Sequence, residues 1–259
     1  MKQRIVTAII GFVIVIPILL IGSWPFVLFT FLLAIIALLE LLKMNKKESW
    51  ILPSILALLF QCCILLYATD IPFTFELDRI LILFVMLLLI YTVLSKNTFS
   101  FTDAGFIIIA SLYVTFGFYF VLEARMAGLN YLLFILFVIW ATDTGAYFFG
   151  RSFGKSKLWP EISPNKTVAG AVGGIVLAIV TTIVFQFVYP FSVGILSILA
   201  VGISISIVGQ VGDLVASAVK RHYNIKDFGH ILPGHGGILD RLDSLIFVLP
   251  YLHLIQFIT

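Results

Sequence analysis

Long apolar segments alternate with short polar ones along the whole chain. Hydrophobic runs of roughly 17–25 residues are long enough to cross a bilayer as helices. Cutting the chain at its polar and turn residues predicts nine such segments, near residues 4–21, 25–42, 51–69, 79–95, 104–122, 129–149, 168–189, 191–216 and 239–258. The pattern therefore predicts an all-α polytopic membrane protein with about nine transmembrane helices.

The composition agrees with this class of protein. Of the 259 residues, 61% are hydrophobic and 11% are charged, whereas soluble domains have about 45–50% apolar and about 25% charged residues. No polar stretch is long enough for a separate soluble domain, and we expect no nucleic-acid partner. The adjacent Cys62 and Cys63 lie in an apolar run without metal-type spacing, so they indicate neither a disulfide nor a metal site.

The basic residues predict the topology through the positive-inside rule. Lys2 and Arg4 place the N-terminus in the cytoplasm, and we read the first apolar segment as a retained span because no cleavage-type site follows it. Alternate loops then carry nearly all other bases, namely Lys43, Lys46, Lys47, Lys96, Arg151, Lys155, Lys157, Lys166, Lys220, Arg221 and Lys226. Nine spans put these loops in the cytoplasm and the C-terminus outside.

Ionisable residues within or beside the spans concentrate in the second half of the chain. We therefore divide the chain into an N-terminal scaffold of transmembrane helices, residues 1–128, and a catalytic transmembrane region, residues 129–259. The catalytic region carries two cytoplasmic loops, residues 150–167 and 217–238. Both face the same side of the membrane in the predicted topology.

Asp143 lies inside a predicted span, about two turns before its cytoplasmic end. A carboxylate in hydrocarbon is costly unless it is paired, metal-bound or wetted, so it indicates function, with a structural hydrogen bond as the alternative. The following Gly150–Ser156 resembles a P-loop, but it has three residues between the glycines instead of four and no preceding strand.

The segment Ser163–Thr167 is predicted to open a helix, where backbone N–H groups beside Lys166 and Thr167 could hold a phosphate. Gly170, Gly173 and Gly174 follow on that helix. Their alternative role is close packing of membrane helices, and both roles are compatible.

Two acidic segments follow. Asp213, Ser217 and either Lys220 or Arg221 recur every three to four residues on one helix face, which indicates a polar stripe or a simple intrahelical ion pair. Asp240 and Asp243 share a face at the start of the last span, as helix-capping acids or as site residues, with Arg241 between them.

A glycine-rich loop precedes this last span. Gly234, Gly236 and Gly237 leave the backbone open around His235 for a close ligand. The histidine spacing matches no zinc motif, so a hard cation on carboxylates is the better expectation.

Carboxylates, bases and open glycines without a nucleophile beside a base are typical of phosphoryl or nucleotidyl transfer. At a membrane surface they predict a metal-dependent phosphotransferase that acts on a lipid phosphate or a lipid alcohol. The residues alone do not select the nucleotide.

The stretch Ser217-x-x-Lys220-Arg221-x4-Lys226-Asp227-x-Gly229-x3-Pro233-x-His235-Gly-Gly-x-x-Asp240-Arg241-x-Asp243 resembles the signature of the phosphatidate cytidylyltransferase, or CDP-diglyceride synthase, family. Trp140-Ala-x-Asp143, Ala146-Tyr147, Gly150-Arg151 and Ser163-Pro-x-Lys166-Thr167 resemble the same family, and the likeness covers the whole chain.

The resemblance implies that CTP and phosphatidate react to give CDP-diacylglycerol and pyrophosphate, with Mg²⁺ and a second cation such as K⁺. It implies that Asp213 and Asp240 bind the metal and that the protein is a homodimer. The other catalytic candidates are Lys220, Arg221 and Asp243, and the substrate-binding candidates are Asp143, Lys166, Thr167, Ser217, Lys226, Asp227, His235, Gly236, Gly237 and Arg241. We expect a multi-pass cell-membrane protein with its active site facing the cytoplasm.

Two alternatives stay open. An ion-coupled transporter would place charges near the bilayer midplane on repeated, broken helices. A CTP-dependent polyprenol kinase would transfer the γ-phosphate and release CDP.

Overall fold

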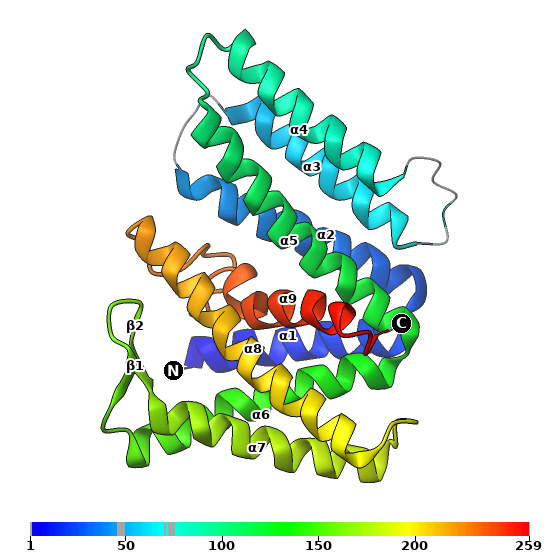
Figure 1. Cartoon of the computed structure of the whole chain (residues 1–259), viewed down its shortest axis with the longest axis vertical. Helices are drawn as coiled ribbons and strands as arrows, with labels where there is room; N and C mark the ends of the chain where they lie inside the picture. Colours follow the sequence, from blue (N-terminus) through cyan, green and yellow to red (C-terminus); the bar gives the residue numbers. More distant parts are fainter. Residues whose placement is uncertain (1, 46–49, 70, 72–75, 259) are drawn as a thin grey trace. The chain divides into compact units, whose positions relative to one another are not determined.

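The computed structural model describes residues 2–45, 50–69, 71 and 76–258. In this part of the chain there are nine α-helices, one short 3-10 helix and one two-stranded antiparallel hairpin (Figure 1). The elements are α1 (Lys2–Ile21), α2 (Ser23–Leu42), η1 (Lys43–Asn45), α3 (Ile51–Tyr67), α4 (Leu77–Leu94), α5 (Phe101–Ala127), α6 (Leu129–Phe153), β1 (Lys157–Trp159), β2 (Ser163–Thr167), α7 (Val168–Val188), α8 (Ile195–His222) and α9 (Leu239–Leu254).

Each of the nine predicted segments corresponds to one of these helices. Lys46 and Lys47, assigned above to a cytoplasmic loop, lie outside the described residues.

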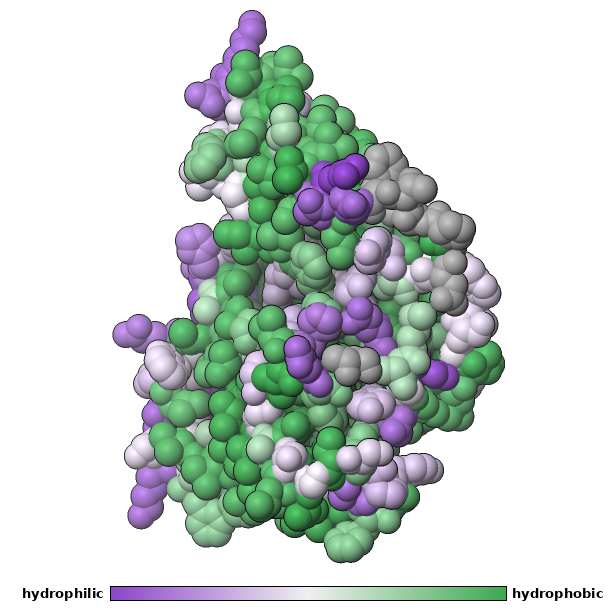
Figure 2. Space-filling view, turned by 45° about the vertical axis from the view of Figure 1, so that its right-hand side comes forward, coloured by the Kyte–Doolittle hydropathy of each residue, from purple (hydrophilic) through white to green (hydrophobic). Residues whose placement is uncertain are grey.

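Six helices in the described part of the chain are long and apolar enough to cross a membrane: α2 with η1, α4, α5, α6, α7 and α8. The apolar helices Ile9–Ile21 and α3 are shorter. Large apolar side chains stay uncovered on these helices, as at Phe187, which is 84% exposed. Hydrophobic residues also dominate the visible face in Figure 2. Such a surface is stable in lipid, so the expected multi-pass membrane class is confirmed.

The chain divides into two compact units. The first comprises Met1–Glu123 and Asp227–Arg241, and in it α1 to α4 pack in succession. Phe60 of α3 stacks on Phe84 of α4 with ring centroids 4.4 Å apart. The side-chain Nε2 of Gln61 donates to the carbonyl of Ala34 at 3.2 Å, so the buried amide nitrogen links α3 to α2.

The second unit comprises Ala124–Lys226 and Leu242–Thr259, and α6 and α7 run side by side in it (Figure 1). Gly145 of α6 lies directly against α7, since a Cβ there would be 2.5 Å from the carbonyl oxygen of Gly173. A Cβ on Gly173 would in turn meet Phe149. Small residues let two membrane helices approach this closely, so the packing role of the glycines is confirmed.

Three helices continue past their predicted C-terminal ends, and the first of them, α5, reaches Ala127 instead of residue 122. α6 continues to Phe153, so Gly150 and Arg151 are helical, and Asp143 lies ten residues before the helix end. α8 continues to His222, so the predicted loop at 217–238 starts later, and Lys220 and Arg221 are helical, as the predicted helix face with Asp213 requires. Neither the α6 nor the α8 extension contains proline, and Ala and Arg favour helix, so these two helices end only at Gly154 and Tyr223.

The segment Ser163–Thr167 leads directly into helix α7, as predicted, but its own backbone forms strand β2. It pairs with β1 through Lys157 opposite Thr167 and Trp159 opposite Ser163. Pro164 disfavours helical backbone at Ser163. The helix begins at Val168, after Thr167 as its N-cap.

We predict that Gly145→Val destabilises the second unit, because the new side chain must separate α6 from α7. Overpacking of this kind typically costs about 1–3 kcal/mol, which should appear as a lower melting temperature in detergent. Gly105→Ala in α5 is the control, because a Cβ there meets nothing within 4 Å. An unchanged melting temperature for Gly145→Val would contradict the close packing of α6 and α7.

Candidate active site

A charged pair joins the hairpin to α8 in the second unit. The Lys166 ammonium lies 2.7 Å from an Asp213 carboxylate oxygen, and Nζ of Lys166 also donates to the carbonyl of Gln210 at 3.3 Å. The Ser217 hydroxyl donates to the other Asp213 oxygen at 3.4 Å. The predicted shared face of Asp213 and Ser217 is therefore confirmed, and Lys166, the base that pairs with Asp213 in this contact, comes from β2.

Arg221 makes different contacts from those of the predicted stripe. Its Nε donates to the carbonyl of Ile162 at 3.3 Å and its Nη1 to that of Ile225 at 3.5 Å. Arg221 thus links the end of α8 to the turn of the hairpin, within the same unit.

A polar pocket of about 220 Å³ surrounds the charged pair. Its lining comes from α6, the hairpin, α7 and α8: Asp143, Ala146, Tyr147, Leu158, Asn165, Lys166, Thr167, Gly170, Ala171, Gln210 and Asp213. Four of the predicted site residues, Asp143, Lys166, Thr167 and Asp213, therefore meet in one pocket. The sequence analysis missed Gln210, whose amide donates to the Ala171 carbonyl at 3.3 Å.

Thr167 shapes the entrance to α7. Its hydroxyl oxygen accepts a hydrogen bond from the backbone N–H of Gly170 at 3.0 Å, which caps the helix. A Cβ at Gly150 would lie 3.1 Å from that hydroxyl oxygen, so glycine keeps α6 close to the cap. The beginning of α7, with its backbone donors and positive dipole end, therefore lies at the pocket beside Lys166.

The glycine-rich segment before α9 belongs to the first unit and is tightly folded. Leu232 N–H donates to the Gly236 carbonyl and His235 N–H donates to the Leu232 carbonyl, both at 2.9 Å. Gly236 has a φ of +84°, a conformation that favours glycine. One oxygen of Asp240 accepts from Phe228 N–H at 2.7 Å and from Gly237 N–H at 3.0 Å. Asp240 therefore holds this loop closed, in addition to any role toward a ligand.

The structure also reveals a residue that the sequence analysis did not select. Glu40, in the last turn of α2, is 5% exposed and accepts from Ile238 N–H at 3.1 Å and Leu239 N–H at 3.0 Å. A negative charge is unfavourable at the C-terminal end of a helix. The position of Glu40 in the sequence therefore indicated that a partner outside α2 stabilises it. Beside Lys43 it resembled an ordinary charged helix end.

The remaining predicted residues fall into the two units. Asp243 is 9% exposed in α9 and accepts from Ser244 N–H at 2.8 Å. The Nδ1 atom of His235 is buried and has no hydrogen-bond partner among the described residues. Asp227 lies beside Gly236 in the first unit, whereas the side chains of Lys226 in the second unit and Arg241 in the first are exposed.

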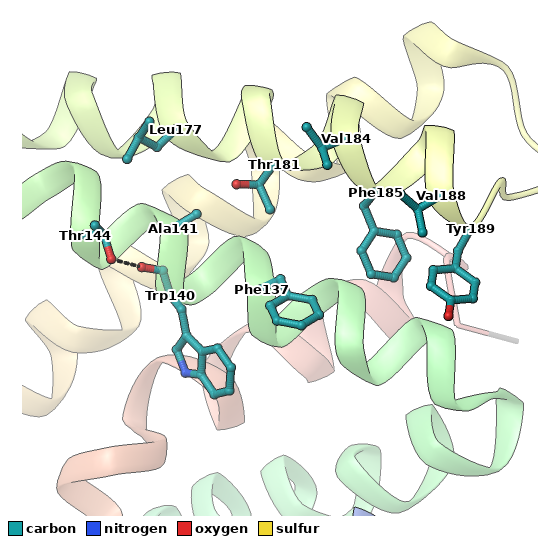
Figure 3. A pocket seen from close by; sticks show the side chains of 10 residues that line it. All are labelled: Phe137, Trp140, Ala141, Thr144, Leu177, Thr181, Val184, Phe185, Val188 and Tyr189. Carbon is teal, nitrogen blue, oxygen red and sulfur yellow. Dashed lines mark hydrogen bonds between the residues drawn. The ribbon is translucent and has the colours of Figure 1, made fainter. Parts of the chain in front are cut away.

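An apolar groove of about 560 Å³ runs between α6 and α7 (Figure 3). Phe137, Trp140, Ala141 and Thr144 line it from α6, and the α7 side includes Leu177 and Phe185. The Thr144 hydroxyl donates to the Trp140 carbonyl at 2.7 Å, so little polarity is left in the groove. Asp143 and Thr144 are neighbours in sequence, and one lines the polar pocket while the other lines the groove.

The donor set in the polar pocket suits a hard cation. Asp143 and Asp213 supply carboxylate oxygens, which Mg²⁺ prefers, and no cysteine or histidine lines the pocket. Within the described ranges no three His, Cys, Asp or Glu residues are grouped closely enough to hold a metal. A cation there would complete its coordination with substrate oxygens or water, as is usual for Mg²⁺.

Apolar helices of membrane-spanning length, with a charged pocket among them, define a multi-pass membrane protein. The comparison with known proteins makes this specific, because the cytidylyltransferase family matches residues 2–259. The chain belongs to this family.

Curated relatives agree over nearly their full length. The chain is 48% identical over 256 residues to a phosphatidate cytidylyltransferase of Staphylococcus saprophyticus, covering 98% of each chain. It is 46% identical over 261 residues to the Bacillus subtilis protein of that name, covering 98% of this chain and 96% of the relative. It is 49% identical over 257 residues to the Staphylococcus haemolyticus protein, covering 98% of both.

Proposed function

We propose that this protein transfers the cytidylyl group of CTP to phosphatidate, producing CDP-diacylglycerol and pyrophosphate for phospholipid synthesis. The observation that carries the proposal is the end-to-end similarity to phosphatidate cytidylyltransferases, at 46–49% identity. The polar pocket supports it, because Lys166, the start of α7 and two carboxylates suit a nucleotide phosphate.

In the proposed reaction a phosphate oxygen of the lipid forms a bond to the α-phosphorus of CTP. The bond from that phosphorus to the bridging oxygen breaks, and pyrophosphate leaves with the electron pair. A phosphomonoester has a second pKa of about 6. The lipid phosphate is therefore already largely ionised, and little general-base catalysis is needed to remove its proton. Lys166 and the N–H groups at the start of α7 would hold phosphate oxygens during this step.

The proposed metal ligands are Asp213 and Asp240, with Asp143 and Asp243 in support. Mg²⁺, when bound, would neutralise phosphate charge, and K⁺ is the proposed second cation. Lys220, Arg221, Lys226 and Arg241 are proposed to attract the phosphates of both substrates. Ser217 would orient Asp213 through the hydrogen bond described above.

The apolar groove supports an amphiphilic substrate. Asp143 lines the polar pocket, and its neighbour Thr144 lines the groove. Helix α6 therefore offers adjacent surfaces to a phosphate and to an acyl chain. We propose the groove as a place for one acyl chain. We also propose that the site faces the cytoplasm of a cell membrane and that the protein is a homodimer.

The first prediction separates cytidylyl transfer from the kinase alternative. Purified protein with Mg²⁺, phosphatidate and CTP labelled at the α-phosphorus should yield labelled lipid, and CTP labelled at the γ-phosphorus should not. Thin-layer chromatography of the lipid fraction measures both. Label from the γ-phosphate in a lipid alcohol would indicate a CTP-dependent kinase, and no labelled lipid with either nucleotide would overturn the proposal.

A second prediction concerns the carboxylates. Asp213→Asn and Asp240→Asn should each lower turnover on the order of 100-fold or more, because lost charge at a phosphoryl centre costs this much. Size-exclusion profiles should stay those of folded protein. Asp78→Asn, on the exposed start of α4, should keep normal activity. Near-normal turnover in either site variant would remove that residue from the proposed metal ligands.

A third prediction tests the groove. Ala141→Phe places a ring in the groove proposed for the acyl chain, so it should raise the KM for long-chain phosphatidate several-fold. The KM for phosphatidate with six-carbon chains should change much less. Val180→Phe, at a half-exposed α7 position outside the groove lining, is the control. Equal KM changes for both lipids would argue against an acyl chain in the groove.

A further inference from the structure

We infer that Glu40 is a positioning residue for the reaction, which holds the glycine-rich loop and the start of α9 so that Asp240 is presented to the substrates. The inference rests on the proposed function and extends it to α2, a helix with no other candidate site residue. All the residues that carry it belong to the first unit.

The Glu40 carboxylate binds the beginning of α9 with both oxygens. Oε1 accepts from Ile238 N–H at 3.1 Å and Oε2 from Leu239 N–H at 3.0 Å, although almost 200 residues separate the partners in sequence. The first N–H groups of a helix have no partner within the helix. Glu40 supplies that partner from another helix, and its negative charge complements the positive end of the α9 dipole.

The loop is shaped around this carboxylate. A Cβ at Gly229 or at Gly237 would collide with the Glu40 side chain. Neither glycine has a positive φ, so the reason for glycine at both positions is the space taken by Glu40 and not the backbone conformation, and a larger residue would have to displace the carboxylate. Two glycines of the signature-like stretch therefore exist to admit an acid from α2.

The same loop depends on Asp240. Gly237 N–H and Phe228 N–H donate to one Asp240 oxygen, and Gly237 immediately precedes the residues that Glu40 binds. The two carboxylates thus fix adjacent peptide groups. Loss of the Glu40 contacts should loosen the backbone that sets the direction of the Asp240 side chain.

Glu40→Gln provides the main test. The amide has one acceptor oxygen and presents an NH₂ group to the second N–H, so one of the two hydrogen bonds must break. Gly229→Ala displaces the same carboxylate from the loop side without altering Glu40, and it carries the test if Glu40→Gln does not fold. Glu76→Gln is the matched control, because Glu76 is an exposed residue that pairs with Arg79.

Two readouts are needed. Hydrogen–deuterium exchange should be at least about tenfold faster at one of the two amides, Ile238 or Leu239, in Glu40→Gln, which keeps a single acceptor oxygen, and at both amides in Gly229→Ala, which displaces the whole carboxylate. In the cytidylyl transfer assay, kcat should fall about 10–100-fold and the Mg²⁺ concentration for half-maximal rate should rise, as for residues that orient a metal ligand. Glu76→Gln should change neither.

Unchanged exchange at Ile238 and Leu239 in both variants would overturn the inference. Faster exchange with normal kcat and normal Mg²⁺ dependence would overturn it as well, since Glu40 would then serve stability alone. The exchange measurement requires no turnover. Absence of labelled lipid with the wild-type protein would therefore count against the proposed function, and the exchange result would still decide whether Glu40 holds the loop.

Discussion

The candidate site depends on one requirement, that each charged group has a partner, and the ion pair between Lys166 and Asp213 meets it. In a chain that is 61% hydrophobic, a charged group needs a partner, because an isolated charge in or near hydrocarbon is costly. The contact of 2.7 Å joins β2 to α8 and brings a base to an acid far away in sequence. Glu40 meets the same demand in the first unit by binding two backbone N–H groups of α9.

These contacts are also what a phosphate site requires. The side chains of Lys166 and Asp213 are 23% and 37% exposed, so solvent weakens the pair and its contribution to stability is small. Both groups stay accessible from the polar pocket and can rearrange when a phosphate competes for the ammonium. In the proposed function, this exposure leaves both groups available to a substrate phosphate and a cation at the polar pocket.

Much of the fold was predictable from the sequence, because apolar runs of helix length mark each of the nine helices within the described residues. The predicted spans that correspond to α5, α6 and α8 ended several residues too early, since polar residues such as Arg151 extend a helix as readily as they begin a loop. The strand Ser163–Thr167 was missed because its partner strand is only three residues long.

The candidate site was predictable where one helix turn brings residues together, as for Asp213 and Ser217. The partner of Asp213 from β2 was not, because a contact over 47 positions leaves no periodic signal. Glu40 was harder still, since its partners are backbone groups, which no side-chain pattern reveals. Gly237, one of the two glycines that admit Glu40, was interpreted as part of a loop open to a ligand.

We propose that the charges around Lys166 serve to bind substrate phosphate and not to stabilise the fold. Equilibrium binding of CTP to Lys166→Met, compared with Lys157→Met on the exposed β1 strand, tests it most directly. We expect Lys166→Met to weaken CTP binding at least about tenfold, since it removes an attraction and leaves the Asp213 charge unopposed, with little change in melting temperature. Wild-type affinity for CTP in Lys166→Met, or equal losses in both variants, would contradict the claim.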